Sequence, residues 1–93
     1  GFSKSLSEEL NYRLKNKKAI CVCFKNGEND LYNCSIRGRN LDVRLLLEDS
    51  IKGLNAKGGG HKFAVGLRIN EKDFNSFKEK ITRLAKDEKY ATN

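Results

Sequence analysis

A run of three glycines, flanked by cations and by the chain's only histidine, is the feature most suited to chemistry. It comprises Lys57, Gly58, Gly59, Gly60, His61 and Lys62. Because glycine loses much backbone freedom on folding, such a run predicts a sharp turn or a ligand that touches bare backbone. Backbone N–H groups beside two ammonium groups and an imidazole suit an anion, above all a phosphate. We therefore expect a phosphate-binding loop, with a plain turn requiring positive φ as the alternative.

Two further groups are expected near this loop. His61, beside two lysines, is expected to be neutral and to contact a phosphate or hydroxyl rather than to act as a general base. Arg37 follows Ser35 at the end of an expected strand, and Arg39 comes two residues later. Since a guanidinium fork matches phosphate oxygens, Ser35, Arg37 and Arg39 are candidate anion ligands. The alternative is a solvated strand end.

The residues needed for cleavage are missing from the sequence. It offers no cluster of carboxylates and histidine for a catalytic metal, and Ser35 has no evident base partner. The three cysteines, Cys21, Cys23 and Cys34, lack the paired spacing and the fourth ligand of a zinc site. They lie in apolar runs, which predicts buried free thiols and a cytoplasmic location. We expect a domain that binds without catalysis and carries no metal or cofactor of its own.

Charge favours a polyanionic partner. The net charge is +7 over 93 residues, and residues 31–68 hold seven basic but only three acidic side chains. A generally lysine-rich surface is the alternative explanation. No apolar stretch approaches the roughly 20 residues that span a bilayer, so no membrane partner is expected. The length predicts one domain over residues 1–93, with its core at about 5–87.

The first half of the chain predicts a helix and then a hairpin. Ser5 and Glu8 form a capping box before leucines at helical spacing, which predicts a helix over 5–16. An apolar run predicts a strand over 19–25. An Asn-Gly turn at 26–29 then leads into an antiparallel strand over 30–36.

The second half predicts a crossover and a final helix. Asn40 is expected to cap a helix over 41–54, and alternation predicts a strand over 62–69. With the strand over 30–36, these compose a right-handed βαβ unit. Asn70 is expected to cap the last helix, whose core-facing residues are Phe74, Phe77, Ile81 and Leu84. The predicted fold is α/β in the mixed α+β sense, with order α-β-β-α-β-α, a small mixed sheet, and a frayed end after about Glu88.

The motifs together resemble a known family. Ser35-Ile36-Arg37, the helix that follows, and the run from Gly58 through His61 to Gly66 resemble the DHH-associated domain. This is the C-terminal module of DHH phosphoesterases, which include RecJ-like single-strand exonucleases and the oligoribonucleases that degrade nanoRNA. The resemblance covers residues 19–87. Val65 and Gly38 depart from the family pattern, which leaves the hydroxyl contact expected at the latter position in doubt.

The resemblance implies a division of labour. An N-terminal DHH domain of the parent chain would hold Mn²⁺ or Mg²⁺ and act as a phosphodiesterase or exonuclease. This module would bind single-stranded nucleic acid or a short oligonucleotide, with Arg37, Gly58, Gly59, Gly60 and His61 at the substrate. One alternative is the related RNA-binding domain of alanyl-tRNA synthetases, which predicts a longer flanking helix than residues 1–16 allow. Another is a protein-interaction domain in which the glycines are structural.

Overall fold

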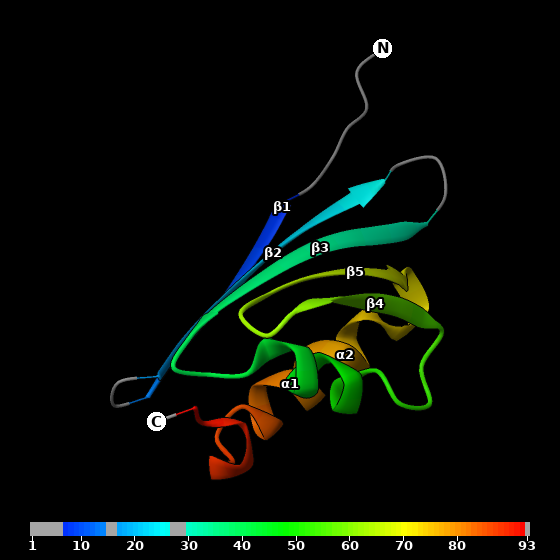
Figure 1. Cartoon of the computed structure of the whole chain (residues 1–93). Coiled ribbons are helices and arrows are strands. Elements are labelled where there is room, and N and C mark those ends of the chain that lie inside the picture. Colours follow the sequence, from blue (N-terminus) through cyan, green and yellow to red (C-terminus); the bar gives the residue numbers. More distant parts are fainter. Residues whose placement is uncertain (1–6, 15–16, 27–29, 93) are drawn as a thin grey trace.

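A five-stranded antiparallel sheet with two helices on one face forms the domain (Figure 1). The structure, a computed structural model, describes residues 7–14, 17–26 and 30–92. The strands lie in the order β1-β2-β3-β5-β4. The elements are β1 (Ser7–Leu14), β2 (Lys17–Asn26), β3 (Leu31–Arg39), α1 (Val43–Ser50), β4 (Ala56–His61), β5 (Ala64–Asn70), α2 (Glu71–Leu84) and a 3₁₀ turn, η1 (Glu88–Tyr90). The mixed α+β class is confirmed, whereas the predicted mixed sheet and the predicted element order are wrong.

The predicted N-terminal helix is a strand. β1 pairs with β2 over its whole length, from Ser7 opposite Phe24 to Leu14 opposite Lys17. Residues 6, 10 and 14 are leucines and fit a helical period, but residues 10, 12 and 14 are apolar or aromatic and fit a period of two equally well. Pairing with β2 favours the strand over the helix, because the backbone of β2 would otherwise form an unpaired edge.

The predicted βαβ crossover is also wrong, because the glycine run is itself a strand. β4 pairs antiparallel with β5 through a two-residue turn at 62–63, and β5 is antiparallel to β3. At Gly58 a Cβ would lie 2.8 Å from Cδ2 of Leu47 in α1 and 2.6 Å from the carbonyl oxygen of Gly66. Glycine therefore lets the strand pair with β5 while the helix packs closely against it.

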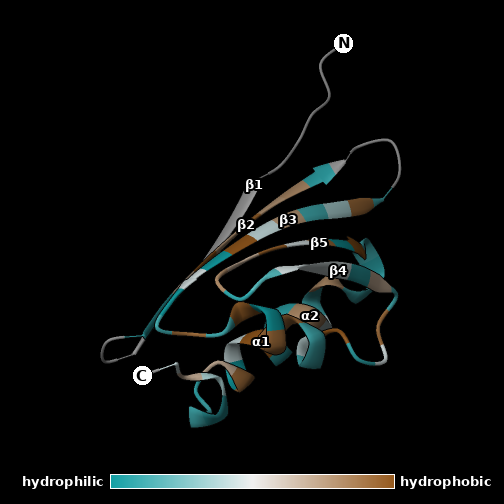
Figure 2. Ribbon diagram, viewed as in Figure 1, coloured by the Kyte–Doolittle hydropathy of each residue, from teal (hydrophilic) through white to brown (hydrophobic). Residues whose placement is uncertain are grey.

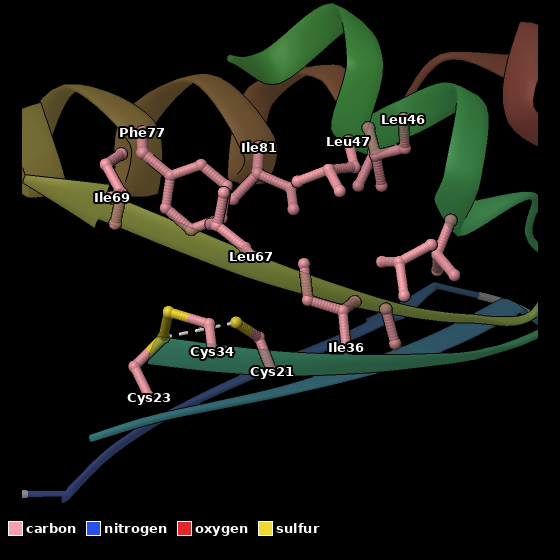
Figure 3. Close-up of a cluster of buried hydrophobic side chains, with 14 of the residues drawn as sticks. Cys21, Cys23, Cys34, Ile36, Leu46, Leu47, Leu67, Ile69, Phe77 and Ile81 are labelled. Atoms are coloured by element: carbon pink, nitrogen blue, oxygen red, sulfur yellow. Dashed lines mark hydrogen bonds between the residues drawn. A yellow bond between two sulfur atoms is a disulfide. The ribbon is translucent and has the colours of Figure 1, made fainter. Parts of the chain in front are cut away.

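The core lies between the sheet and the helices. Along β3 and β5 buried and exposed residues alternate, and the ribbon colour alternates with them (Figure 2). Leu46 and Leu47 of α1 and Phe77 and Ile81 of α2 point toward Leu67 of β5 and its neighbours (Figure 3). The predicted stripe of α2 is confirmed, with its last member, Leu84, only partly buried; Asn70 caps the helix as expected, by accepting from the Lys72 N–H.

The cysteines differ in part from expectation. Cys23 and Cys34 stand opposite each other on β2 and β3 and form a disulfide (Figure 3). Cys21 remains a buried thiol, as expected, and burial raises its pKa to about 12. The prediction of free thiols is wrong for Cys23 and Cys34. Their pairing depends on the strand register, which places their Cα atoms 4.0 Å apart. The Asn-Gly turn predicted at 26–29 stays a prediction, because residues 27–29 lie outside the described residues.

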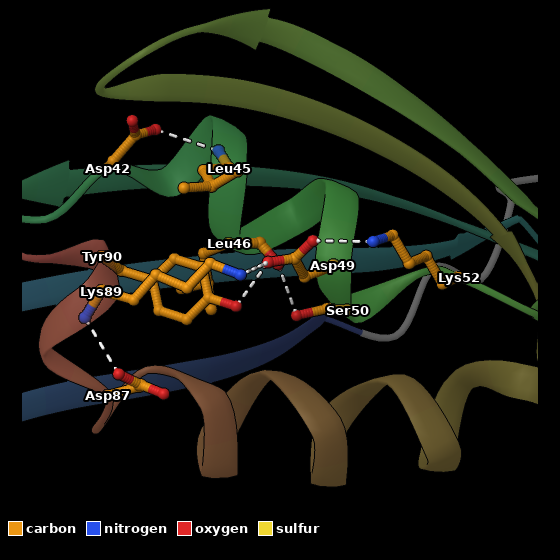
Figure 4. A network of polar contacts seen from close by, with 9 residues as sticks. All are labelled: Asp42, Leu45, Leu46, Asp49, Ser50, Lys52, Asp87, Lys89 and Tyr90. Atoms are coloured by element: carbon orange, nitrogen blue, oxygen red, sulfur yellow. Dashed lines mark hydrogen bonds and ion pairs between the residues drawn. The ribbon is translucent and has the colours of Figure 1, made fainter.

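The N-cap and the length of α1 differ from the prediction, and so does the segment around Tyr90. Asp42, not Asn40, caps α1 by accepting from the Leu45 N–H at 2.9 Å (Figure 4), and the helix ends at Ser50 rather than at residue 54. Tyr90, expected to lie in a frayed segment, is buried, and its backbone oxygen accepts from the Asp42 N–H. In the described residues no helix is both long and apolar enough to cross a membrane.

Candidate phosphate-binding face

The sheet face opposite the helices gathers most of the predicted site residues. We call this surface the open face, defined by the outward positions of β2 to β5. They are Lys18, Ile20, Val22, Phe24, Asn33, Ser35, Arg37, Arg39, Lys57, Gly59, His61, Ala64, Gly66 and Arg68. Strand pairing sets these residues in rows that cross the sheet, so residues far apart in sequence become neighbours.

One row is basic at the β4 edge. Lys57 stands opposite Arg68 of β5, and Arg68 stands opposite Asn33 of β3. The Arg68 Nε donates to the Asn33 Oδ1 at 3.4 Å, which orients the guanidinium along the row. These three side chains line a hollow of about 450 Å³ on the open face, whose floor includes Gly58 and Gly66.

The next row is a floor of small residues. Gly59 lies opposite Gly66, and Gly66 lies opposite Ser35. A Cβ built on Gly59 meets nothing within 4 Å, and one built on Gly66 meets only the Cys34 carbonyl oxygen, at 3.9 Å. Bare backbone is thus exposed in the middle of the open face, with a serine hydroxyl beside it.

The third row carries the histidine. His61 stands opposite Ala64, and Ala64 stands opposite Arg37. Arg39 follows on β3, opposite Lys18 of β2, and these two basic residues line a second hollow of about 190 Å³ together with Arg37 and Ile20. The glycine floor is therefore bordered by cations on both sides along the strands.

Not every predicted residue reaches this face. At Gly58 and Gly60 a Cβ would collide with the rest of the domain, so glycine is needed there for packing. Gly60 also has φ of +148°, and a Cβ there would lie 2.6 Å from the Ala64 carbonyl oxygen. Lys62 is in the turn between β4 and β5, where its backbone oxygen accepts from the N–H of Val43 in α1 at 2.9 Å. The glycine run is a strand followed by a turn rather than a loop, and of its three glycines Gly59 alone has its Cβ position in open space.

The open face is basic over β2 to β5. Its residues there include five cations and one histidine but no carboxylate, and β1 places Glu9 opposite Val22 on the β1 side of this face. Within the described ranges, neither Arg37, Arg39 nor Lys57 has a carboxylate partner; the ion pairs of α1 and α2 lie on the helical side of the sheet. Exposed cations without acidic neighbours attract polyanions.

Sequence reasoning missed Arg68, Asn33 and Lys18. The alternation of β5 was a sufficient signal for Arg68, because it puts that residue on the same face as Gly66. Asn33 and Lys18 join the site through strand pairing, which the sequence does not specify.

A comparison with protein-family models identifies the family of the chain. A family model described as the DHHA1 domain matches residues 2–87. The chain belongs to the DHHA1 domain family. DHHA1 domains are associated with DHH-family phosphoesterases. No curated protein matches this DHHA1 domain.

One cluster of metal-ligating residue types is present in the described part of the DHHA1 domain. The sulfur atoms of Cys21, Cys23 and Cys34 lie within 4.8 Å of one another on the buried side of the sheet. Two of them are joined in the disulfide, and Cys21 is protonated at neutral pH because burial raises the pKa of its thiol. The cluster thus lies on the face of the sheet opposite the open face.

Proposed function

We propose that this DHHA1 domain binds the phosphates of single-stranded nucleic acid, or of a short oligonucleotide, on its open face. The observation that carries the proposal is the glycine floor at Gly59 and Gly66, bordered by Lys57 and Arg68 on one side and by His61 and Arg37 on the other. Phosphate oxygens can approach exposed backbone there while guanidinium and ammonium groups reach them from both sides.

The catalytic step would belong to another part of the parent protein. We infer a DHH domain in the same polypeptide, holding Mn²⁺ or Mg²⁺ and cleaving phosphodiester bonds as a RecJ-like exonuclease or an oligoribonuclease. The family match supports the association with a DHH phosphoesterase. In this arrangement the open face would bind the substrate, and its positions on β2 to β5 carry cations and no carboxylate.

Salt-dependent binding to a labelled single-stranded oligonucleotide tests the proposal. Each phosphate that the protein neutralises contributes about −0.7 to the slope of log K against log salt for single strands. Arg37→Ala should weaken binding by about 1–3 kcal/mol and make the slope shallower by about 0.7, because one charge-assisted contact is lost. Arg83→Ala, an exposed arginine of α2 on the helical side, is the matched control and should bind like the parent.

Two results would contradict the proposal. Absence of binding at low salt would exclude the open face as a phosphate site. Equal losses for the Arg37 and Arg83 variants would show that net charge, and not this face, governs binding.

A further inference from the structure

An exposed aromatic side chain stands at the far end of the basic row. Phe24 of β2 is 49% exposed, and it lies directly opposite Asn33 of β3. One exposed aromatic ring is ordinary on a protein surface, but Phe24 shares a row with an asparagine and two cations, which is the arrangement that points to a ligand. Tyr32, the neighbouring aromatic, is buried with its ring stacked on Phe74 at 3.8 Å.

The row as a whole matches the two chemical parts of a nucleotide. It runs from Phe24 through Asn33 and Arg68 to Lys57, across four adjacent strands. With strands about 4.8 Å apart, Phe24 and Arg68 are about 10 Å apart across the sheet. The hollow of about 450 Å³ occupies the β3–β5–β4 part of this row, so a sugar and phosphate can lie there while a base reaches β2.

We propose that Phe24 is a stacking platform for one unpaired nucleobase of a strand whose phosphate is bound by Arg68 and Lys57. The proposal rests on the proposed function and adds a base-binding subsite to its phosphate site. Aromatic rings bind bases of any identity through their π faces, whereas phosphate contacts alone do not distinguish an oligonucleotide from another polyanion. In a duplex the base faces are covered by stacking, so the subsite would select single strands.

The decisive measurement compares two ligands of equal charge. Fluorescence anisotropy is recorded for a labelled single-stranded oligonucleotide and for the same backbone with abasic sites throughout. We expect the parent domain to bind the base-containing strand about 5- to 150-fold more tightly, the range that corresponds to stacking of about 1–3 kcal/mol. Phe24→Leu should abolish this difference while leaving affinity for the abasic strand and its salt slope unchanged.

Phe63→Leu provides the matched control, since Phe63 is 45% exposed but lies in the turn between β4 and β5. It should keep the preference for bases. Equal binding of both ligands by the parent, with a steep salt slope, would overturn the Phe24 subsite and leave the phosphate site standing. Loss of the preference in the Phe63 variant alone would overturn the subsite as well. Failure of both ligands to bind would overturn both proposals.

Discussion

Single alanine substitutions along the glycine run should separate folding from binding. β4 alternates its faces, so Gly58 and Gly60 meet the rest of the domain whereas Gly59 meets the open face. The same chemical change, one methyl group in place of hydrogen, therefore encounters three different surroundings within three residues. That makes the run an internally controlled experiment.

The magnitudes follow from what each Cβ would touch. At Gly58 it would lie 2.6 Å from a backbone oxygen and 2.8 Å from a leucine methyl, which is an overpacking strain of about 1–3 kcal/mol. At Gly60 a φ of +148° adds a conformational cost of about 1–3 kcal/mol to a clash with the Ala64 carbonyl oxygen. At Gly59 nothing lies within 4 Å, so removing glycine's excess backbone freedom should raise stability by about 0.5–1 kcal/mol.

Thermal unfolding measures the effect of each substitution on stability, and oligonucleotide titration measures its effect on affinity. For a domain of this size, 1 kcal/mol shifts Tm by about 4–8 °C. Gly58→Ala and Gly60→Ala should therefore lower Tm by at least about 4 °C, and Gly59→Ala should raise it by about 2–8 °C. The variant with raised stability should be the one with weakened binding. Gly59→Ala should bind the oligonucleotide about 10-fold more weakly than the parent, because its methyl group occupies the floor on which a phosphate would rest.

A different pattern would refute this reasoning. If Gly59→Ala binds like the parent, the backbone floor is not approached by the ligand and the cations act as a diffuse patch. If Gly58→Ala is as stable as the parent, α1 does not pack on β4 in the way described. Gly66→Ala, on the second floor glycine with its nearest contact at 3.9 Å, should repeat the behaviour of Gly59→Ala and checks the floor independently.

Two further predictions concern the frame that holds the open face. The Tyr90 hydroxyl donates to Asp49 at 2.5 Å, and this bond, with Lys89 and Lys52 at 3.2 Å, lowers the pKa of Asp49 to about 2 (Figure 4). Because the folded-state pKa of Asp49 lies below the usual 3.8, this stabilisation is present above about pH 4 and is lost as the pH falls toward 2. Tyr90→Phe should lower the free energy of unfolding, measured in urea at pH 7, by about 1.5–3 kcal/mol. The stability of this variant should also depend less on pH between about 4 and 2. The Cys23–Cys34 disulfide closes a loop of 11 residues, so a reductant should lower the free energy of unfolding by about 3 kcal/mol, whereas a Cys23→Ala/Cys34→Ala variant should not respond to reductant.

The parts of the fold that the sequence predicts correctly are those with a single compatible period. α2 carries Phe74, Phe77 and Ile81 at helical spacing after an Asn70 cap, and nothing in its sequence fits a strand. β2 is an apolar run and β3 alternates between buried and exposed residues, with turn residues between the two strands. The prediction for the first element is wrong because leucines at 6, 10 and 14 fit both a helical period and a strand period. Pairing with the otherwise unpaired edge of β2 favours the strand, and that is a tertiary effect.

The candidate site was predictable as a list of residues but not as a surface. Lys57, His61 and Arg37 were recognised by residue type, and strand pairing brings them to one face. The alternation of β5 was enough to place Arg68 on the face of Gly66, but its pairing with Lys57 could not be expected, because the glycine run was predicted to be a loop and a loop defines no facing partners. Register, rather than composition, makes Arg68 the partner of Lys57.

The alternation of β4 also explains why the glycines are consecutive. A turn or a helix contact needs glycine at a single position, and a ligand that approaches backbone needs it on one face of a strand. In β4 the hydrogen of Gly58 and of Gly60 leaves room for Leu47 and the β5 backbone, while Gly59 leaves the open face bare; under the proposed function, the two requirements fall on adjacent residues. The choice between a structural run and a binding run is therefore made residue by residue. Under the proposed function, substitution of the middle glycine alone should impair binding in a domain that still folds.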